Sequence, residues 1–256
     1  MRCAVVTGAA QGIGRTTAEK FAKSGYALAL IDLRKPEATL ESLRSLGAES
    51  VAQAGDITDE RVVEAFKNEV QRRFGAVSVL VNNAGISSIS PAEDLSAAEY
   101  RRVLEVNLVA PFLLSKAFGA SMLAARSGAI VNVASIAGLV GVADRAGYNA
   151  SKHGLIGLTR TLAAEWGGRG VRVNAVCPGW VKTEMDVTAQ ASGLYNDSDI
   201  TNRVPMGRFA TSDDVANAIL FLADETKSGF INGHTLVVDG GWTADGSWES
   251  LRLGNR

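Results

Sequence analysis

Short apolar runs alternate with longer amphipathic segments along nearly the whole chain, and this alternation limits the possible folds more than any other feature. Most of the apolar runs are rich in Val, Ile and Leu and show no regular polar–apolar alternation, which is typical of strands that are buried on both faces. We predict strands over residues 4–7, 27–31, 50–54, 77–81, 129–133, 171–176 and 236–238.

The segments between these runs have the length and periodicity of helices. They cover residues 12–24, 36–46, 59–74, 96–125, 149–166 and 212–223. Capping residues support two of them: Ser96 stands three residues before Glu99, and Thr211 and Ser212 stand before Val215 in the last segment. Repeated strand–helix–strand units with right-handed crossovers predict an α/β fold, a doubly wound parallel sheet with helices on both faces.

Composition excludes several classes of protein. The chain has 256 residues and a formal net charge of −1, whereas a nucleic-acid-binding protein normally carries a basic patch. No apolar run is expected to span a membrane, and the first strand follows Met1 directly, so we expect no export signal. Cys3 and Cys177 each stand in an apolar run, which favours free thiols and a cytoplasmic location.

No linker or repeat divides the chain, so we predict a single domain over residues 1–256. The least regular stretch, about 183–208, is polar and longer than an ordinary connection. Segments of this kind inside a compact domain are usually lids or binding loops. We therefore predict a substrate lid there.

The first strand leads into a glycine-rich loop, Thr7-Gly8-Ala9-Ala10-Gln11-Gly12-Ile13-Gly14. Glycines permit a tight turn and a close approach of backbone amides to a pyrophosphate at the start of the next helix. The spacing, Gly-x-x-x-Gly-x-Gly, differs from the G-x-G-x-x-G fingerprint, and such a loop alone is often only a turn. The preceding strand and the following helix favour a dinucleotide site.

Asp32 ends the second apolar run. A carboxylate there would accept hydrogen bonds from ribose hydroxyls and repel a 2′-phosphate, which predicts NAD rather than NADP. The alternatives are that Asp32 merely closes a strand, and that Arg15 or Arg34 binds a phosphate. Asp56, just after the third run, is either an adenine contact or a turn residue.

Tyr148 and Lys152 are four residues apart on one predicted helix and therefore share a face. The pKa of tyrosine in water is about 10. An ammonium about 4 Å away would favour the phenolate by roughly 4 kcal/mol, about three pKa units, which would make the phenol a working base. Ser135 follows the fifth strand at the edge where ligands bind, and could hold a substrate oxygen. Taken singly, such a pair and such a serine are more often surface and turn residues.

Asn107 is unexpected in an apolar helical run, and Pro111 follows four residues later. Because Pro111 has no N–H, the carbonyl of residue 107 is free to bind water that could pass a proton onward from Lys152. The alternative is a kinked helix with a hydrogen-bonded asparagine.

Together these motifs resemble the short-chain dehydrogenase/reductase family over residues 2–242. The resemblance lies in the glycine loop, Asn107, Ser135 and three further motifs: Asn82-Asn83-Ala84-Gly85, Tyr148-x-x-x-Lys152 and Pro178-Gly179. It implies a Rossmann-type, seven-stranded sheet in the order 3-2-1-4-5-6-7 and a catalytic tetrad of Asn107, Ser135, Tyr148 and Lys152. It also implies a homotetramer through residues 107–125 and 149–166.

The resemblance also assigns parts of the nucleotide site. Residues 83–85 would line the adenosine side, Lys152 would bond the nicotinamide ribose, and Val181 and Thr183 would contact the carboxamide. The predicted cofactor-binding set is Gly8, Gln11, Gly12, Ile13, Gly14, Asp32, Asp56, Ile57, Asn83, Ala84, Gly85, Tyr148, Lys152, Pro178, Gly179, Val181 and Thr183.

We therefore predict an NAD-dependent dehydrogenase of secondary alcohols. Its predicted substrate contacts are Ser135, Tyr148, Trp180 and Tyr195. An entrance with Trp180, Met185 and Tyr195 and a polar lid suits a sugar, polyol or hydroxy acid. His153 and His234 have no partners at ligand spacing, so we expect no metal.

Two alternatives remain. One is an NADPH-dependent 3-oxoacyl thioester reductase, which the lid disfavours because its residues 184–200 carry Glu184, Asp186, Asp197 and Asp199 and no basic residue to bind a carrier protein. The other is a nucleotide-binding protein without catalysis, which a complete tetrad disfavours.

Overall fold

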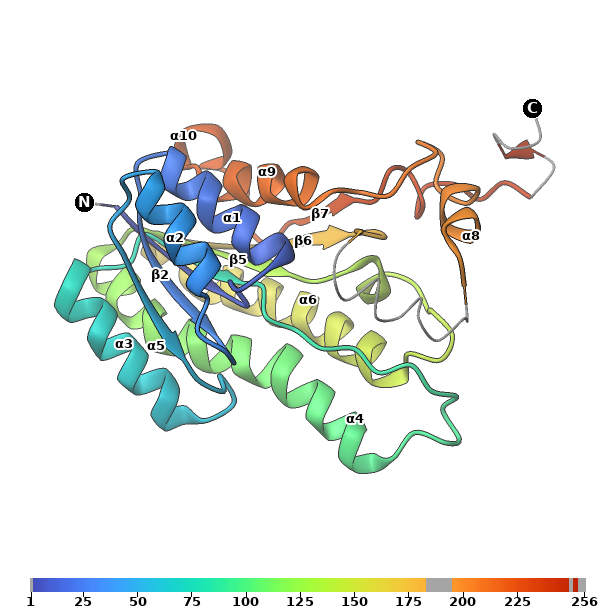
Figure 1. The fold of residues 1–256 in the computed structure, drawn as a ribbon, viewed down its shortest axis with the longest axis horizontal. Coiled ribbons are helices and arrows are strands. Elements are labelled where there is room, and N and C mark those ends of the chain that lie inside the picture. The colour runs from blue at the N-terminus through green and yellow to red at the C-terminus, as the bar shows by residue number, and fades with distance from the viewer. Residues whose placement is uncertain (1, 183–194, 249–250, 253–256) are drawn as a thin grey trace.

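The computed structural model describes residues 2–182, 195–248 and 251–252. Seven parallel strands form one sheet in the order β3-β2-β1-β4-β5-β6-β7, as the family resemblance implies (Figure 1). The strands are β1 (Cys3–Thr7), β2 (Ala27–Asp32), β3 (Ser50–Ala54), β4 (Val79–Asn82), β5 (Gly128–Val133), β6 (Val171–Pro178) and β7 (Thr235–Val238).

Helices cover both faces of the sheet (Figure 1). One face packs against α1 (Gly12–Lys23), α2 (Glu37–Ser45) and α9 (Ser212–Ala223). The other packs against α3 (Glu60–Phe74), α5 (Ala110–Ala125) and α6 (Ala146–Trp166). The helix α4 (Ala97–Leu104) precedes α5, and two short helices are α8 (Asp197–Thr201) and α10 (Glu225–Ser228).

The inner strands are apolar without alternation because each face of the sheet has its own core, whereas the edge strand β3 (Ser50–Ala54) is only partly buried. In β1, Val5 belongs to the core beneath α3 and α5, while Ala4 and Val6 belong to the core beneath α1 and α9. All three side chains are fully buried. Successive side chains point to opposite faces of a strand, so burial on both faces requires a continuous apolar run.

The predicted helix over 96–125 is interrupted. A π-helical turn, Glu105–Val109, separates α4 from α5, and Pro111 lies at the start of α5. Proline cannot donate the helical hydrogen bond that a continuous helix would need there, which favours a wider turn before it. The helix predicted from residue 149 begins three residues earlier, at Ala146. Within the predicted lid, residues 183–194 lie outside the described part of the chain.

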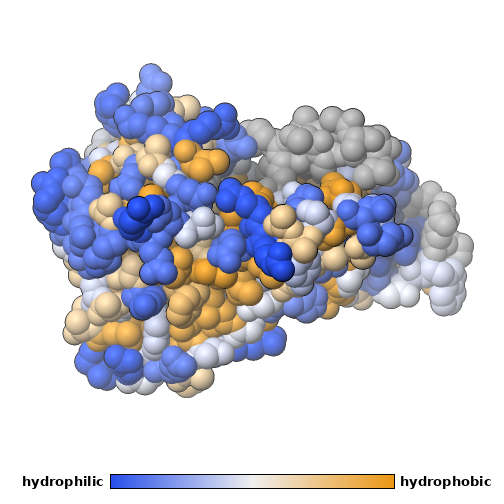
Figure 2. Space-filling view, turned by 90° about the horizontal axis from the view of Figure 1, so that it is seen from below, coloured by the Kyte–Doolittle hydropathy of each residue, from blue (hydrophilic) through white to orange (hydrophobic). Residues whose placement is uncertain are grey.

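The helical stretch Ala97–Ala125 is long and apolar enough to cross a membrane by length and composition, contrary to the expectation from sequence. Core helices of globular proteins pass the same test, so this is weak evidence. Only 39% of its most apolar window is buried, and Phe112 in α5 is 44% exposed. Figure 2 shows an apolar patch on the face seen from below, the side on which α4 and α5 lie in Figure 1.

Candidate functional site

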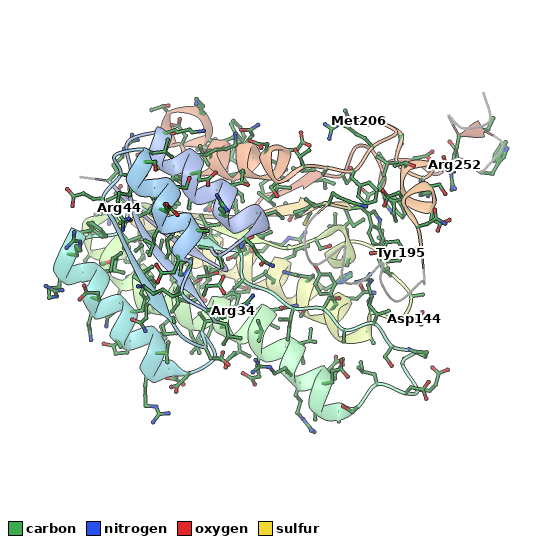
Figure 3. All side chains as sticks on the ribbon, in the orientation of Figure 1. Arg34, Arg44, Asp144, Tyr195, Met206 and Arg252 are labelled. Carbon is green, nitrogen blue, oxygen red and sulfur yellow. The ribbon has the colours of Figure 1, made fainter. Side chains whose placement is uncertain are left out.

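A cavity of about 410 Å³ lies at the carboxyl ends of the parallel strands. Loops that follow six of the strands line it, which is where ligands bind in open α/β sheets. Arg34 and Tyr195 both line the cavity, and Figure 3 shows them well apart. The cavity is thus elongated, with one end near Arg34 and the other near Tyr195.

The glycine loop forms the floor of the first end. Gly8 has a φ of +63°, and a Cβ at this position would lie 2.8 Å from the Cα of Ala84. A Cβ on Gly14 would lie 2.1 Å from the carbonyl oxygen of Gly8. The helix α1 begins at Gly12, and Gln11 before it makes no side-chain capping bond. No side chain of the described residues caps the first amides of α1, which fits an anion such as a pyrophosphate.

Asn83 fixes this loop against the end of β4. Its Nδ2 donates to the carbonyl oxygens of Thr7 at 2.9 Å and Gly8 at 3.1 Å. In turn, Thr7 Oγ1 accepts the backbone N–H groups of Asn83 and Ala84. These bonds hold residues 83–85 against the glycine loop, where they line the cavity.

Asp32 lies at the cavity edge, where its Oδ2 accepts the backbone N–H of Ala10 at 2.9 Å. Of the two arginines that could bind a phosphate, Arg15 is paired with Glu19 at 3.0 Å and does not line the cavity. Arg34 lines the cavity, is exposed, and has no ion pair within the described residues. The site therefore presents one carboxylate and one guanidinium where a ribose would lie.

Asp56 has the environment of a turn residue. Its Oδ1 accepts the backbone N–H of Thr58 at 3.0 Å and the Thr58 hydroxyl at 2.8 Å, and its Oδ2 lies 3.3 Å from Nη1 of Arg102. The backbone hydrogen bond from Thr58 is the main reason that the pKa of Asp56 is lowered. The carboxylate still lines the cavity, so the turn role is observed and an adenine contact stays a prediction.

Ser135, Tyr148 and Lys152 meet at the other end of the cavity. The hydroxyl of Ser135 accepts the N–H of Ala137 at 3.1 Å and hydrogen-bonds the phenol of Tyr148. Lys152 is 4% exposed, and its Nζ lies 5.5 Å from the centroid of the Tyr148 ring. Its ammonium donates to the carbonyl oxygen of Val133 at 2.8 Å.

The electrostatics of this pair contradict the expectation that Lys152 acidifies Tyr148 in the free protein. Burial raises the pKa of Tyr148, while the hydrogen bond from Ser135 and the charge of Arg145 lower it in part. Burial also lowers the pKa of Lys152 to about 8. Spacing correctly brought the two residues together, but removal from water disfavours the charged form of each.

Asn107 lies behind the cavity wall rather than in it, fully buried in the π-helical turn. Its Oδ1 accepts the N–H of Ile86 and its Nδ2 donates to the carbonyl oxygen of Ile86, both at 2.8 Å. The same Nδ2 lies 3.1 Å from Oγ of Ser151, beside Lys152. The Asn107 side chain therefore agrees with the alternative from the sequence, a kinked helix with a hydrogen-bonded asparagine.

Aromatic side chains close the second end. Trp180 stacks at a tilt on Tyr195 and Trp242, with ring centroids 5.3 and 5.9 Å apart. Both predicted substrate aromatics, Trp180 and Tyr195, line the cavity. Met185, which we expected beside them, lies outside the described residues, as does Thr183.

All other predicted site residues line the cavity except Gly14 and Asn107, which support its wall from behind. Sequence reasoning missed Ser87, Arg102 and Arg145, which line it too. A signal for Arg145 exists, because it is the residue immediately before the helix that carries Tyr148. No signal marks Ser87 or Arg102. No cluster of three or more metal-ligating side chains occurs in the described ranges.

Comparison with known proteins shows which families and proteins the chain is similar to. A family model described as enoyl-(acyl carrier protein) reductase matches residues 8–243. D-threitol dehydrogenase of Mycolicibacterium smegmatis is 42% identical over 246 residues, 94% of this chain and 93% of that protein. Cis-4-hydroxycyclohexanecarboxylate dehydrogenase of Sinomonas cyclohexanicum is 42% identical over 247 residues, 95% of this chain and 97% of that protein.

A solved structure of a similar protein has the same fold. It is that of a protein from Beutenbergia cavernae, provisionally named an NAD(P)-dependent gluconate 5-dehydrogenase, with bound NADP at low occupancy. The alignment has a TM-score of 0.89 and 41% identity, and covers 95% of this chain and 97% of that one.

Proposed function

Because the chain belongs to the short-chain dehydrogenase/reductase family and is an oxidoreductase acting on CH–OH groups with a nicotinamide cofactor, we propose that it oxidises a small polar secondary alcohol with NAD. One observation carries the proposal. Ser135, Tyr148 and Lys152 occupy one end of an elongated cavity whose other end holds the uncapped start of α1 and the carboxylate of Asp32.

The residues present fit a dinucleotide. The amides at the start of α1 would bind the pyrophosphate, Asp32 the adenosine ribose, and Asp56 and Ile57 the adenine side. Val181 lines the cavity beyond Pro178 and Gly179, where it would contact the carboxamide. When bound, the nicotinamide ring supplies the hydride acceptor for the carbinol carbon.

The protein's own groups would handle the proton. Ser135 would hold the substrate oxygen, and Tyr148 Oη would take the hydroxyl proton as the C–H bond breaks. In the free protein the Lys152 ammonium bonds the carbonyl oxygen of Val133, and we propose that it turns to the nicotinamide ribose on binding. Its charge would then favour the phenolate, which the free protein disfavours.

The preference for NAD rests on Asp32. A 2′-phosphate placed beside its carboxylate would be repelled, whereas ribose hydroxyls would donate to it. Arg34 is the opposing observation, because it is a cation at the same edge and has no ion pair among the described residues. The solved relative from Beutenbergia cavernae was found with NADP, so both cofactors must be assayed.

The substrate class follows from the cavity and from the relatives. The end near Tyr148 combines hydroxyl, phenol and guanidinium groups with aromatic walls, which suits a small polar molecule. The relatives are named for a polyol, a hydroxy acid and gluconate. We propose the same class here: a sugar, polyol or hydroxy acid.

We also propose a cytoplasmic homotetramer. The exposed apolar patch on the side of α4 and α5 supports contact with further copies of the chain (Figure 2). Size-exclusion chromatography with light scattering tests this directly. A monomer at micromolar concentration would overturn it.

A paired screen tests the function. Purified protein is assayed for NADH and NADPH formation with sugars, polyols, hydroxy acids and 3-hydroxyacyl thioesters. The proposal expects NADH formation with members of the first three classes. Preference for NADPH with a 3-oxoacyl thioester would favour the reductase alternative, which the family model's name keeps open. Cofactor binding without turnover on any substrate would favour a non-catalytic protein.

A further inference from the structure

Arg145 has no role in the predicted site, yet it lines the same end of the cavity as the reacting groups. It is the residue immediately before α6, and Tyr148 follows three positions later. Its side chain and that of Tyr148 both line the cavity. The charge of Arg145 reaches the phenol, since it lowers the pKa of Tyr148.

Neighbouring groups fix the position of this guanidinium. Its Nη1 donates to Oγ of Ser87 at 3.0 Å, and its Cζ lies 5.6 Å from the ring centroid of Trp180. Asp144 before it has a φ of +60°, and its carbonyl oxygen accepts the N–H of Ser90 at 2.8 Å. Backbone at Arg145 is thereby tied to the loop that carries Ser87, so the guanidinium is held at the wall rather than free in solvent.

Among the residues that the structure describes, none forms an ion pair with Arg145, whereas Arg203 and Arg208 have partners at 3.0 and 2.7 Å. The described carboxylates that line the cavity, Asp32 and Asp56, belong to the adenosine end. A partly buried cation that faces a cavity without a counter-ion is costly unless a ligand supplies the opposite charge.

The surrounding wall offers hydrogen-bond donors in excess. Ser87 occupies only one of the five N–H donors of the Arg145 guanidinium. The indole Nε1–H of Trp180 is buried and has no acceptor within the described chain. A group that carries only acceptors would satisfy such a wall, and a carboxylate matches the planar fork of a guanidinium.

We infer that Arg145 binds a carboxylate of the substrate, so that the alcohol oxidised is a hydroxy acid rather than a neutral sugar or polyol. The inference deepens the proposed function and rests on it. When the reacting hydroxyl of the substrate lies at Ser135 and Tyr148, its carboxylate would lie at Arg145, at the same end of the cavity. Recognition at this distance requires both groups on one small molecule.

Matched substrates test the inference. Hydroxy acids such as 3-hydroxybutanoate and 4-hydroxycyclohexanecarboxylate are compared with their primary amides, which have nearly the same shape without the charge. We expect Arg145→Met to lower kcat/KM for the acids by about 100-fold, chiefly through KM, and to change kcat/KM for the amides by less than about threefold. Arg145→Lys should recover part of the loss. Arg61→Met removes an exposed charge on α3 that does not line the cavity, and should change neither substrate series.

Equal losses for acids and amides would overturn the inference, because Arg145 would then act only through the phenol of Tyr148 or through packing. A wild-type protein that prefers the amides would overturn it as well. A binding measurement separates this failure from failure of the proposed function. Butanoate and cyclohexanecarboxylate, with NAD present, should raise the Tm of the wild type but not of Arg145→Met, and their primary amides should raise neither. If the carboxylates raise the Tm of the wild type and of Arg145→Met equally, the inference fails even where turnover is found.

Discussion

The side-chain amide of Asn107 pairs with both backbone groups of Ile86. Its Oδ1 accepts the Ile86 N–H and its Nδ2 donates to the Ile86 carbonyl oxygen, each at 2.8 Å. Ile86 follows the end of β4, and the Asn107 amide gives its backbone the two hydrogen bonds that a neighbouring strand would otherwise supply. Because Gly85 and Ile86 line the cavity, Asn107 determines the position of the wall between the two ends.

Asn107→Asp should therefore destabilise the protein strongly. The substitution keeps the shape but replaces the donor to Ile86 and Ser151 with a second acceptor in a fully buried site. We expect a loss of about 3 kcal/mol or more in the free energy of unfolding, measured by urea denaturation. Asn217→Asp on the exposed side of α9 is the matched control and should change it by less than about 0.5 kcal/mol. Similar small changes in both variants would contradict the structural role.

Tyr148→Phe should abolish turnover and leave cofactor binding intact. It removes only the hydroxyl that would carry the proton, so we expect kcat to fall by about 10³-fold or more. Binding of NADH, followed by its fluorescence, should change by less than about threefold. Tyr26→Phe, far from the cavity, is the control and should retain full activity. A substantial residual rate in Tyr148→Phe would exclude the phenol as the proton carrier.

Asp32→Ala should weaken the preference for NAD. Loss of the carboxylate removes both the ribose acceptor and the repulsion of a 2′-phosphate, so the ratio of kcat/KM for NAD to that for NADP should fall more than about tenfold. Arg34→Ala tests the opposing charge and should raise the same ratio if the guanidinium binds the phosphate. An unchanged ratio in Asp32→Ala would show that the carboxylate only orders the loop, through its bond from Ala10.

Lys152 should make stability depend on pH in the alkaline range. Its pKa is lowered from 10.5 to about 8 by burial, so between these values the folded state holds fewer protons than the unfolded state. The unfolding free energy of the wild type should then rise by about 3 kcal/mol relative to that of Lys152→Met between about pH 8 and pH 10.5. Below about pH 8 the difference between the two proteins should be constant. Urea denaturation of the cofactor-free proteins at several pH values measures this difference. A constant difference across the range would mean that Lys152 is not neutral when buried.

Gly14→Ala should disrupt the nucleotide end. The added Cβ would lie 2.1 Å from the Gly8 carbonyl oxygen and 2.6 Å from Nδ2 of Asn83, so the loop must shift. We expect a loss of about 3 kcal/mol or more in unfolding free energy and weaker NADH binding. Gly157→Ala is the matched helical control, since nothing lies within 4 Å of its added Cβ, and should stabilise by about 0.5–1 kcal/mol. Equal effects of the two variants would contradict the close packing at Gly14.

Local patterns determined much of this protein. The run Cys3–Thr7 is apolar at every position because both of its faces are covered, and that pattern can be read without coordinates. The glycine spacing after it likewise predicts a tight loop before a helix. The four-residue separation of Tyr148 and Lys152 placed both on one face of a helix. These features depend on neighbouring residues only, so periodicity and spacing are sufficient to find them.

The tertiary structure decided the rest, because burial and long-range partners depend on segments that are distant in sequence. Asp56 pairs with Arg102, 46 residues away, and Asn107 with Ile86 across 21 residues, and no local pattern encodes either pair. The raised pKa of Tyr148 likewise comes mainly from its burial, which is opposite to the expectation from spacing alone. Arg145 acquires its proposed role only because the fold places it at a cavity where no described carboxylate forms an ion pair with it.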